Sequence, residues 1–195
     1  VRVLPAVWAW KRSMRDSGRL AHATFRELPA QLPPGSLLVF NRTKVVPACL
    51  TLVKPTGGRI QVLFVDLKGD KLRCLVRGHA AIGTELRLGQ RALFQVDETI
   101  GRMTILKPLF RGSLLRLLDR HGEAPLPPYI KHSPLDRRER RSRYQTVFAK
   151  TAGSIASPSA SLHFTRRLLA DLRRAGINYA FITLHVGMGT FAPLE

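Results

Sequence analysis

The sequence predicts an α/β (α+β) main domain with a small antiparallel β-barrel inserted into it. Apolar runs typical of buried strands occur early in the chain, at 36–40, and late, at 177–186. The late run directly follows an amphipathic helical pattern at 165–175, and a helix followed by an apolar strand is typical of α/β structure. Between the two runs the chain breaks into short β-like stretches separated by glycine turns, which favours a small barrel or sandwich.

An inserted domain explains this order economically. We expect residues 1–48 and 123–195 to form the main domain, incomplete on its C-terminal side, and residues 49–122 to form the barrel. A simple three-segment single domain is the alternative. The length of 195 residues suits one medium domain or two small ones, and 45% hydrophobic residues are enough for a packed core.

The first segment alternates turn signals with apolar runs. Proline, glycine and polar clusters mark the turns, and continuous apolar residues mark the strand. We expect a turn or short helical piece at 24–29, a turn at 33–35, a buried strand at 36–40, a polar turn at 41–44 and extended chain at 45–47.

The middle segment carries five short β-like runs with glycines between them. The runs lie at 59–66, 71–77, 84–88, 91–96 and 102–107. Strands this short and this evenly spaced are typical of a small antiparallel barrel or sandwich.

Beyond the middle segment, leucines at helical spacing predict a helix at 113–121 that Gly122 ends. A stiff proline-rich linker follows at 124–130. Small residues at 151–161 predict a loop. The helix at 165–175 places leucines on one side and arginines on the other.

The chain is strongly basic, with 32 Lys and Arg against 13 Asp and Glu and a formal net charge of +19. This imbalance favours a polyanionic partner, with nucleic acid as the first candidate and an anionic membrane surface as the second. An arginine-rich surface produced by codon preference is the alternative. No apolar run approaches the roughly 20 residues that cross a bilayer, and the first residues lack a secretory signal pattern, so we expect a cytoplasmic protein without a membrane partner.

The chain has two cysteines, Cys49 and Cys74, and no Cys or His spacing typical of a metal site. We therefore expect no structural zinc and no metal cofactor. Two lone cysteines in an enzyme-like chain are more often free thiols than a disulfide, which also points to a reducing cytoplasm.

The best candidate site is the stretch at 184–191, which continues the late apolar run. His185 could act as an acid, a base or a hydrogen-bond donor, and Gly187 and Gly189 permit close approach of the backbone to a ligand. The alternative is a buried histidine held by a backbone partner, with glycines that make a turn. The residues alone favour this alternative.

Two further stretches are candidates for ligand contacts. Asn41 and Thr43 follow the early apolar run and either bind a ligand or close a turn, and the turn is the safer interpretation. Small residues at 157–161 precede a predicted helix, where unpaired N–H groups suit a phosphate or the carboxylate of methionine. A flexible loop with a Ser/Thr cap is the alternative to this anion site.

A cluster of arginines follows the proline-rich linker. Such a cluster could hold phosphates, with Tyr144 nearby to stack on a base. A solvated surface segment is the alternative. The five arginines are Arg137, Arg138, Arg140, Arg141 and Arg143.

Six stretches in the same order and spacing make the chain resemble the family of S-adenosylmethionine:tRNA ribosyltransferase-isomerases of queuosine biosynthesis. One such stretch would be a weak signal, whereas six in order are specific. The stretches lie at 38–48, 57–63, 125–130, 143–147, 157–164 and 184–191.

The resemblance implies a transfer of the ribosyl part of S-adenosylmethionine to 7-aminomethyl-7-deazaguanine in tRNA, with isomerisation to epoxyqueuosine and release of adenine and methionine. It implies tRNA and S-adenosylmethionine as partners of a monomer, with no cofactor beyond this co-substrate. His163 and His185 are the candidate bases. The residues expected to bind substrate are Asn41, Thr43, Tyr129, Ser159, Gly187, Gly189, Thr190 and Phe191, and the five clustered arginines are expected to bind tRNA.

The resemblance covers roughly the first half of the family's sequence, and later family motifs are absent from these residues. Cys49 stands where the family usually has Arg, Gln61 where it has Glu, and Ser161 where it has Gly. These features favour an enzyme by family whose 195 residues alone are inactive. A non-catalytic basic RNA-binding remnant and an inactive fragment are the alternatives.

Overall fold

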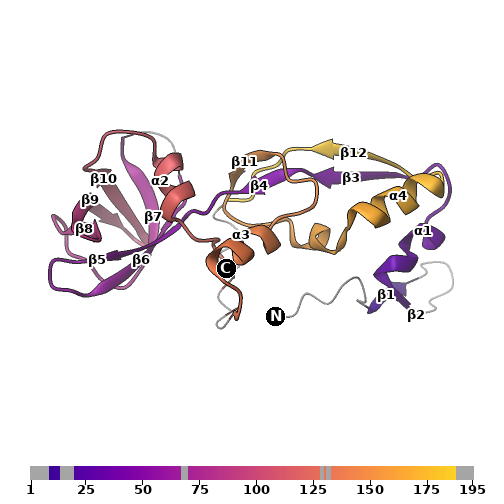
Figure 1. The fold of residues 1–195 in the computed structure, drawn as a ribbon, viewed down its shortest axis with the longest axis horizontal. Coiled ribbons are helices and arrows are strands. Elements are labelled where there is room, and N and C mark those ends of the chain that lie inside the picture. Colours follow the sequence, from indigo (N-terminus) through magenta and orange to yellow (C-terminus); the bar gives the residue numbers. More distant parts are fainter. Residues whose placement is uncertain (1–8, 14–19, 67–69, 128–129, 131–132, 188–195) are drawn as a thin grey trace.

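The computed structural model describes residues 9–13, 20–66, 70–127, 130 and 133–187 (Figure 1). A closed barrel lies at one end of the molecule, and two pairs of parallel strands with helix α4 (Arg166–Arg174) lie toward the other. An antiparallel hairpin of β1 (Ala9–Ser13) and β2 (Leu20–Thr24) lies at the same end as α4. Within the described part of the chain, no helix is long and apolar enough to span a bilayer.

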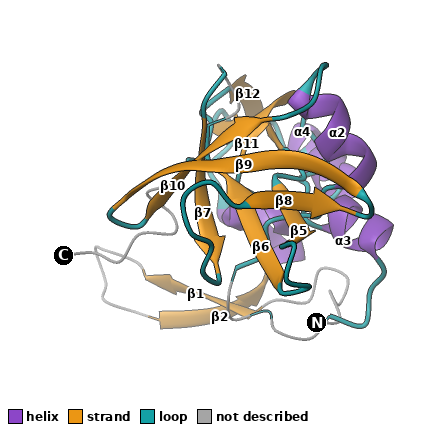
Figure 2. Cartoon of the chain, turned by 90° about the vertical axis from the view of Figure 1, so that its left-hand side faces the viewer, coloured by secondary structure: helices purple, strands orange, loops and turns teal. Residues whose placement is uncertain are grey.

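Six antiparallel strands close the barrel, and Figure 2 shows the molecule from the barrel side. Their order around the barrel is β10-β7-β6-β5-β8-β9, so most neighbours are joined by short hairpins. The small antiparallel barrel expected from the sequence is therefore confirmed. The strands are β5 (Cys49–Val53), β6 (Arg59–Phe64), β7 (Leu72–Arg77), β8 (Glu85–Leu88), β9 (Arg91–Ile100) and β10 (Met103–Pro108).

Alternate residues of the barrel strands point inward, because successive side chains of a strand face opposite sides. In β6, Ile60, Val62 and Phe64 are buried while their neighbours are exposed or half-buried. The rings of Phe64 and Phe94 meet inside with centroids 5.2 Å apart. Of the two hydrophobic cores formed by the described residues, this closed apolar interior is the larger.

Two barrel strands differ from the sequence prediction. Strand β5 lies where no separate β run was expected, because its apolar residues continue the preceding extended segment without a turn signal. Strand β9 continues beyond Val96 to Ile100 and pairs with β10 across a turn at Gly101, whose φ of +56° suits glycine.

Two pairs of parallel strands make up the α/β part. Strand β3 (Leu37–Asn41) pairs with β12 (Asn178–Ile182), and strand β4 (Thr43–Val45) pairs with β11 (Thr151–Ser154). The N–H of Arg42, between β3 and β4, donates to the carbonyl of Ile182. The early and late apolar runs of the sequence are therefore neighbours, as the α/β prediction requires.

Helix α4 follows its sequence prediction closely. The Thr165 hydroxyl caps its first turn by accepting a hydrogen bond from the N–H of Leu168 at 3.1 Å. Leu168 and Leu172 are buried in a second core together with Phe40 of β3. Gly176 stops the helix with a φ of +72°, a conformation that favours glycine.

The prediction that the two apolar runs form fully buried strands is wrong. Leu37 and Val39 of β3 are exposed, and so are Phe181 and Ile182 of β12. Among the described residues, helix α4 packs against one face of this two-stranded sheet only, so Leu37, Val39 and Ile182 on the other face remain in contact with solvent. Phe181 lies on the covered face, where its ring contacts Phe40 and Phe148, and it is 36% exposed.

Two segments expected to be irregular carry regular structure. The polar turn at 41–44 contains the start of β4, and the loop at 151–161 contains β11 and the start of the 3₁₀ helix η2 (Ser159–His163). The arginine cluster, for which no secondary structure was predicted, forms helix α3 (Arg137–Arg143). All three segments are short and polar, so their hydrophobic period is too weak to read from the sequence.

The remaining helices agree with the sequence. The piece expected at 24–29 is a 3₁₀ helix η1 (Phe25–Glu27) followed by α1 (Leu28–Gln31). Helix α2 (Leu114–His121) ends at Gly122 and inserts Leu118 into the core of the barrel. The division into domains after residues 48 and 122 stays a prediction.

Candidate functional site

The candidate site forms where β3 ends and the chain leaves β12. Asn41, the last residue of β3, donates from Nδ2 to the carbonyl of Leu184 at 2.8 Å. Its Oδ1 accepts from the N–H of Leu184 at 3.0 Å and from the N–H of Thr43 at 3.1 Å. A single amide therefore fixes the segment after β12 against the start of β4.

The buried hydroxyl groups of Thr43 and Ser154 connect the same two segments next to His185. The Thr43 Oγ1 lies 2.8 Å from His185 Nδ1 and 2.9 Å from the Oγ of Ser154. The N–H of Val186 donates to the same Ser154 Oγ at 2.7 Å. Thr43 and Ser154 are buried whereas His185 is exposed, so interior groups hold an imidazole that solvent reaches.

Gly153 gives the His185 ring its space. The residue has a φ of +151°, and a Cβ on it would come within 2.6 to 2.8 Å of Cε1, Nε2 and Nδ1 of the ring. Any larger residue would therefore displace the imidazole. The position of His185 depends on this glycine as well as on the Thr43 hydroxyl.

The direction of the Thr43 hydroxyl proton determines which tautomer a neutral His185 ring adopts. Thr43 has one hydroxyl proton, so it donates either to Ser154 or to His185. In the first case Nδ1 of a neutral ring carries the proton and Nε2 is a free acceptor, which suits a base. In the second case Nε2 carries the proton and is a donor, which suits an acid.

The structure therefore brings together three of the predicted site residues, Asn41, Thr43 and His185. The expectation that His185 is a buried residue with a backbone partner is wrong, because the ring is exposed and contacts a hydroxyl. Asn41 does close a turn, because its Oδ1 accepts from the N–H of Thr43, but the side chains of Asn41 and Thr43 also form hydrogen bonds across the fold.

The other predicted site residues lie in different settings. His163 ends η2, and its ring packs against Phe25 with centroids 5.3 Å apart. Ser159 and Gly187 are exposed. Because residues 159–161 lie within η2, and Thr165 caps α4, the small residues do not form that helix's N-terminus. The predictions for Tyr129, Gly189, Thr190 and Phe191 lie outside the described residues.

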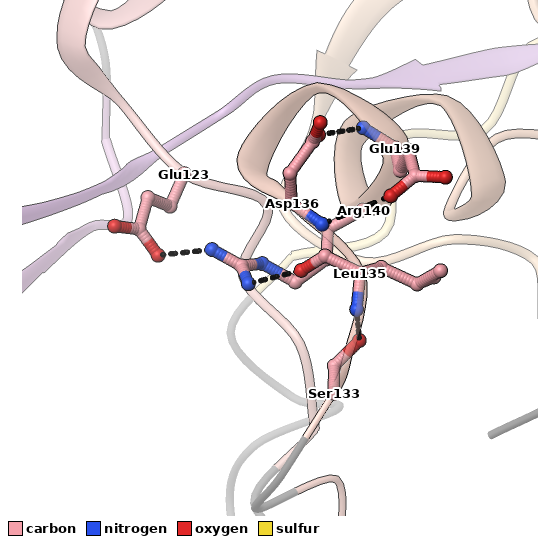
Figure 3. A network of polar contacts seen from close by, with 6 residues as sticks. All are labelled: Glu123, Ser133, Leu135, Asp136, Glu139 and Arg140. Atoms are coloured by element: carbon pink, nitrogen blue, oxygen red, sulfur yellow. Dashed lines mark hydrogen bonds and ion pairs between the residues drawn. The ribbon is translucent and has the colours of Figure 1, made fainter.

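The arginines of α3 divide into those whose side chains bind other parts of the protein and those that are exposed to solvent. Arg140 donates to the Leu135 carbonyl at 2.7 Å and pairs with Glu123 at 3.5 Å, beside the capping box of Asp136 and Glu139 (Figure 3). Arg141 binds the carboxylate and the carbonyl of Asp119. These contacts join α3 to α2 and to the chain that follows α2.

The remaining arginines differ in their contacts. Arg137 donates to the carbonyl of Arg120. Arg138 and Arg143 are exposed, and no hydrogen bond or ion pair to another described residue is found for either. These two guanidinium groups are the ones best placed to meet a polyanion.

A cavity of about 1250 Å³ is lined by residues of the barrel, mainly of β6 and β7, by the loop that follows β7 and by the chain after α2. Cys49 and Gln61, two positions where the chain departs from the resembled family, both contribute to it. Burial raises the pKa of the Cys49 thiol to about 12, with Glu123 adding to the effect. Both cysteines are free thiols, as expected, and the structure buries both of them.

Sequence reasoning missed three residues around the site. Ser154 and Gly153 lie in β11, which was expected to be a loop. Gln145 accepts from the Val45 N–H at 2.9 Å and donates to its carbonyl at 2.8 Å, which holds β4 from the side. Among the described residues, no group of three or more His, Cys, Asp or Glu side chains is arranged to hold a metal ion.

Comparisons with known proteins agree on one family. The sequence profile of the family described as "Queuosine biosynthesis protein" matches residues 11–195. A protein named S-adenosylmethionine:tRNA ribosyltransferase-isomerase from Aquifex aeolicus is 43% identical over 185 residues, which is 93% of this chain and 54% of that protein. The protein of the same name from Thermus thermophilus is 42% identical over 91% of this chain and 53% of its own length.

A solved structure is also similar in sequence. The S-adenosylmethionine tRNA ribosyltransferase from Thermotoga maritima is 26% identical, with coverage of 97% of this chain and 54% of that chain and a TM-score of 0.33. The chain spans about half the length of the relatives it matches.

Proposed function

The chain belongs to the family of queuosine biosynthesis proteins, and from this premise we propose that it takes part in a tRNA modification. The reaction transfers and isomerises the ribosyl part of S-adenosylmethionine onto 7-aminomethyl-7-deazaguanine in tRNA. It gives epoxyqueuosine and releases adenine and methionine. This chemistry requires no metal and no cofactor beyond the co-substrate.

The observation that carries the proposal is the setting of His185. Its Nδ1 is held 2.8 Å from a buried hydroxyl, while the residue itself is exposed to solvent. An imidazole fixed in one orientation and open on its other side suits proton transfer, because a base must be held within reach of the proton it removes.

The proposed role of His185 is to remove a proton beside the sulfonium of S-adenosylmethionine. A positive sulfur acidifies the neighbouring C–H, so a neutral imidazole is a sufficient base once it is positioned. The tautomer with the proton on Nδ1 leaves Nε2 free for this step. His163 is the second candidate, but its ring packs against Phe25 and has less freedom to meet a substrate.

The charge of the chain supports tRNA as the partner. The net charge is +19, and Arg138 and Arg143 of α3 and Arg166 and Arg167 of α4 are exposed. Phosphate contacts by such side chains supply most of the non-specific affinity for nucleic acid. Asn41 and Gly187 then remain as candidate contacts to the small substrate, whereas the buried Thr43 acts through His185.

Adenine release tests the proposal. The protein for the assay is this chain joined to the part of the Aquifex aeolicus relative that it does not match, hereafter the joined protein. It is incubated with S-adenosylmethionine and tRNA that carries the precursor base, and free adenine is measured. His185→Ala should reduce adenine release by at least 100-fold, as expected for a general base, and should leave tRNA affinity unchanged.

His121→Ala is the matched control, since His121 is an exposed histidine at the end of α2. It should leave both adenine release and tRNA affinity unchanged. Equal activity of the His185→Ala and His121→Ala proteins would exclude His185 as the base.

A second candidate function is a basic RNA-binding protein without catalysis. The exposed arginines favour it independently of the His185 site. In that case the joined protein binds tRNA with the same salt dependence as expected for the enzyme, but it releases no adenine at any pH.

A further inference from the structure

One face of the β3–β12 sheet is apolar and open to solvent. Residues opposite each other in parallel strands point to the same side, and Val39 lies opposite Ala180 while Asn41 lies opposite Ile182. On this side Leu37 is 61% exposed, Val39 55% and Ile182 43%, and Leu184 just beyond β12 is 61% exposed. We call Leu37, Val39, Ala180, Ile182 and Leu184 the open face.

The opposite side of the same sheet is packed. Phe40 of β3 contacts Phe164 with ring centroids 4.6 Å apart and Phe148 with centroids 4.9 Å apart. Leu168 and Leu172 of α4 complete this core. The two sides of the sheet therefore differ in cover and not in composition, because both are mainly apolar.

An uncovered side is unusual for a parallel sheet. Parallel strands occur almost only where both faces are covered, and two strands alone are marginally stable in water. Contiguous exposed apolar side chains on a sheet commonly mark a contact surface. The open face is therefore suited to receive a second apolar layer.

The composition of the open face indicates what kind of partner it fits. All five of its residues are uncharged. On the same side of the sheet, Asn41 lies opposite Ile182 and Asn178 lies opposite Leu37, and both asparagines are polar without charge. A nucleic acid requires cations to neutralise its phosphates, so tRNA does not fit here. An apolar protein layer does.

The relatives supply a candidate for that layer. The chain matches 54% of the Aquifex aeolicus protein and 53% of the Thermus thermophilus protein, so about half of each relative lies outside the matched region. We propose that the open face is the docking surface for this remaining part of the family's sequence. The docked layer would cover Val39 and Ile182 in the way that α4 covers Phe40.

The open face ends at the candidate site. Asn41 belongs to the same side of β3 and holds Leu184, the neighbour of His185, through two hydrogen bonds. A layer docked on the open face would therefore border the His185 site. The docking itself does not depend on the proposed chemistry, and it is tested by binding.

The first test is co-purification. The 195-residue chain carries an affinity tag and is co-expressed with the unmatched part of the Aquifex aeolicus relative. The wild-type chain should retain the partner, and Val39→Asp and Ile182→Asp should each reduce the retained amount at least 10-fold. Ile100→Asp is the matched control, because Ile100 is 57% exposed on β9 of the barrel and should leave retention unchanged.

A second test excludes misfolding of the variants or of the partner as the cause. In the 195-residue chain alone, Val39→Asp and Ile100→Asp should change the melting temperature equally little, since both positions are exposed. In the joined protein, Val39→Asp should lower it by at least 5 °C more than Ile100→Asp does, because docking buries Val39.

Three outcomes would overturn the proposal. The first is equal retention of the partner by wild type, Val39→Asp and Ile100→Asp, or no retention by any of them. The second is the same melting temperature for the two variants in the joined protein. The third is a dimer of the 195-residue chain that Val39→Asp dissociates, which would assign the open face to a second copy.

Discussion

The Nδ1 atom of His185 lies 2.8 Å from the hydroxyl oxygen of Thr43, a residue 142 positions earlier in the chain. The contact links the segment after β12 to the first residue of β4. It connects a ring exposed to solvent with a hydroxyl that is almost fully buried. Thr43 is therefore a positioning residue for His185.

Removing the Thr43 hydroxyl should impair the positioned ring. We expect Thr43→Val to lower adenine release by the joined protein roughly fivefold, because one hydrogen bond contributes about 1 kcal/mol. The loss should fall on kcat and leave the KM for S-adenosylmethionine unchanged, because a base acts in the chemical step. Thr43→Ser keeps the hydroxyl and should restore kcat. A loss of activity that Thr43→Ser does not restore would show that the hydroxyl has only a structural role.

Adding a methyl group to Gly153 should displace the ring by steric contact. Gly153→Ala places a Cβ about 2.6 Å from His185 Cε1, whereas Gly57→Ala adds a Cβ with no neighbour within 4 Å. Both glycines have a positive φ, so both changes strain the backbone by about 1 kcal/mol or more. Only Gly153→Ala should alter the His185 ring signals in an NMR spectrum. Identical spectra for the two variants would contradict the placement of the ring.

The two arginine groups of α3 should respond differently to substitution. Arg138→Ala with Arg143→Ala should reduce the slope of log affinity for tRNA against log salt by roughly 0.7 to 0.9 for each phosphate that the variant no longer neutralises. Arg141→Ala should mainly lower the melting temperature, because Arg141 holds Asp119 of α2. The prediction fails if the double variant binds tRNA with the wild-type slope.

The cysteines should be unreactive in the folded protein. Burial raises the pKa of the Cys49 thiol to about 12 and raises that of Cys74 further still, so the reactive thiolate is scarce at pH 8. Labelling by a thiol reagent at pH 8 should be at least 100-fold slower in the native protein than in denaturant. Rapid labelling of the native protein would contradict this burial.

The same pKa shift should make stability fall at high pH. The unfolded thiol, with a pKa of 9.0, loses its proton before the folded thiol of Cys49 does, at about 12. Cys49 should therefore contribute a decrease in the free energy of unfolding of about 1.4 kcal/mol per pH unit between pH 9 and pH 12. In denaturant titrations, Cys49→Ala should remove this contribution and leave the decrease that the buried Cys74 causes in the same way.

Local sequence patterns were sufficient for most barrel strands and for α4. Short apolar runs separated by glycine turns predict antiparallel neighbours in chain order. They did not predict β5, nor the pairings of β5 with β8 and of β10 with β7 that close the barrel. The leucine period and the Thr165 and Gly176 caps define α4 locally. The stretch at 184–191 was also identified as a candidate site, through its histidine and through the family pattern.

The tertiary structure alone decided which groups meet at that site and which apolar residues stay exposed. Ser154 reaches Thr43 across 111 positions, and no periodic pattern records a hydrogen bond between such distant residues. The runs containing Val39 and Ile182 are apolar on both sides, so sequence reasoning predicted burial. Burial depends on a second layer over the sheet, and within the described structure α4 covers only the side of Phe40.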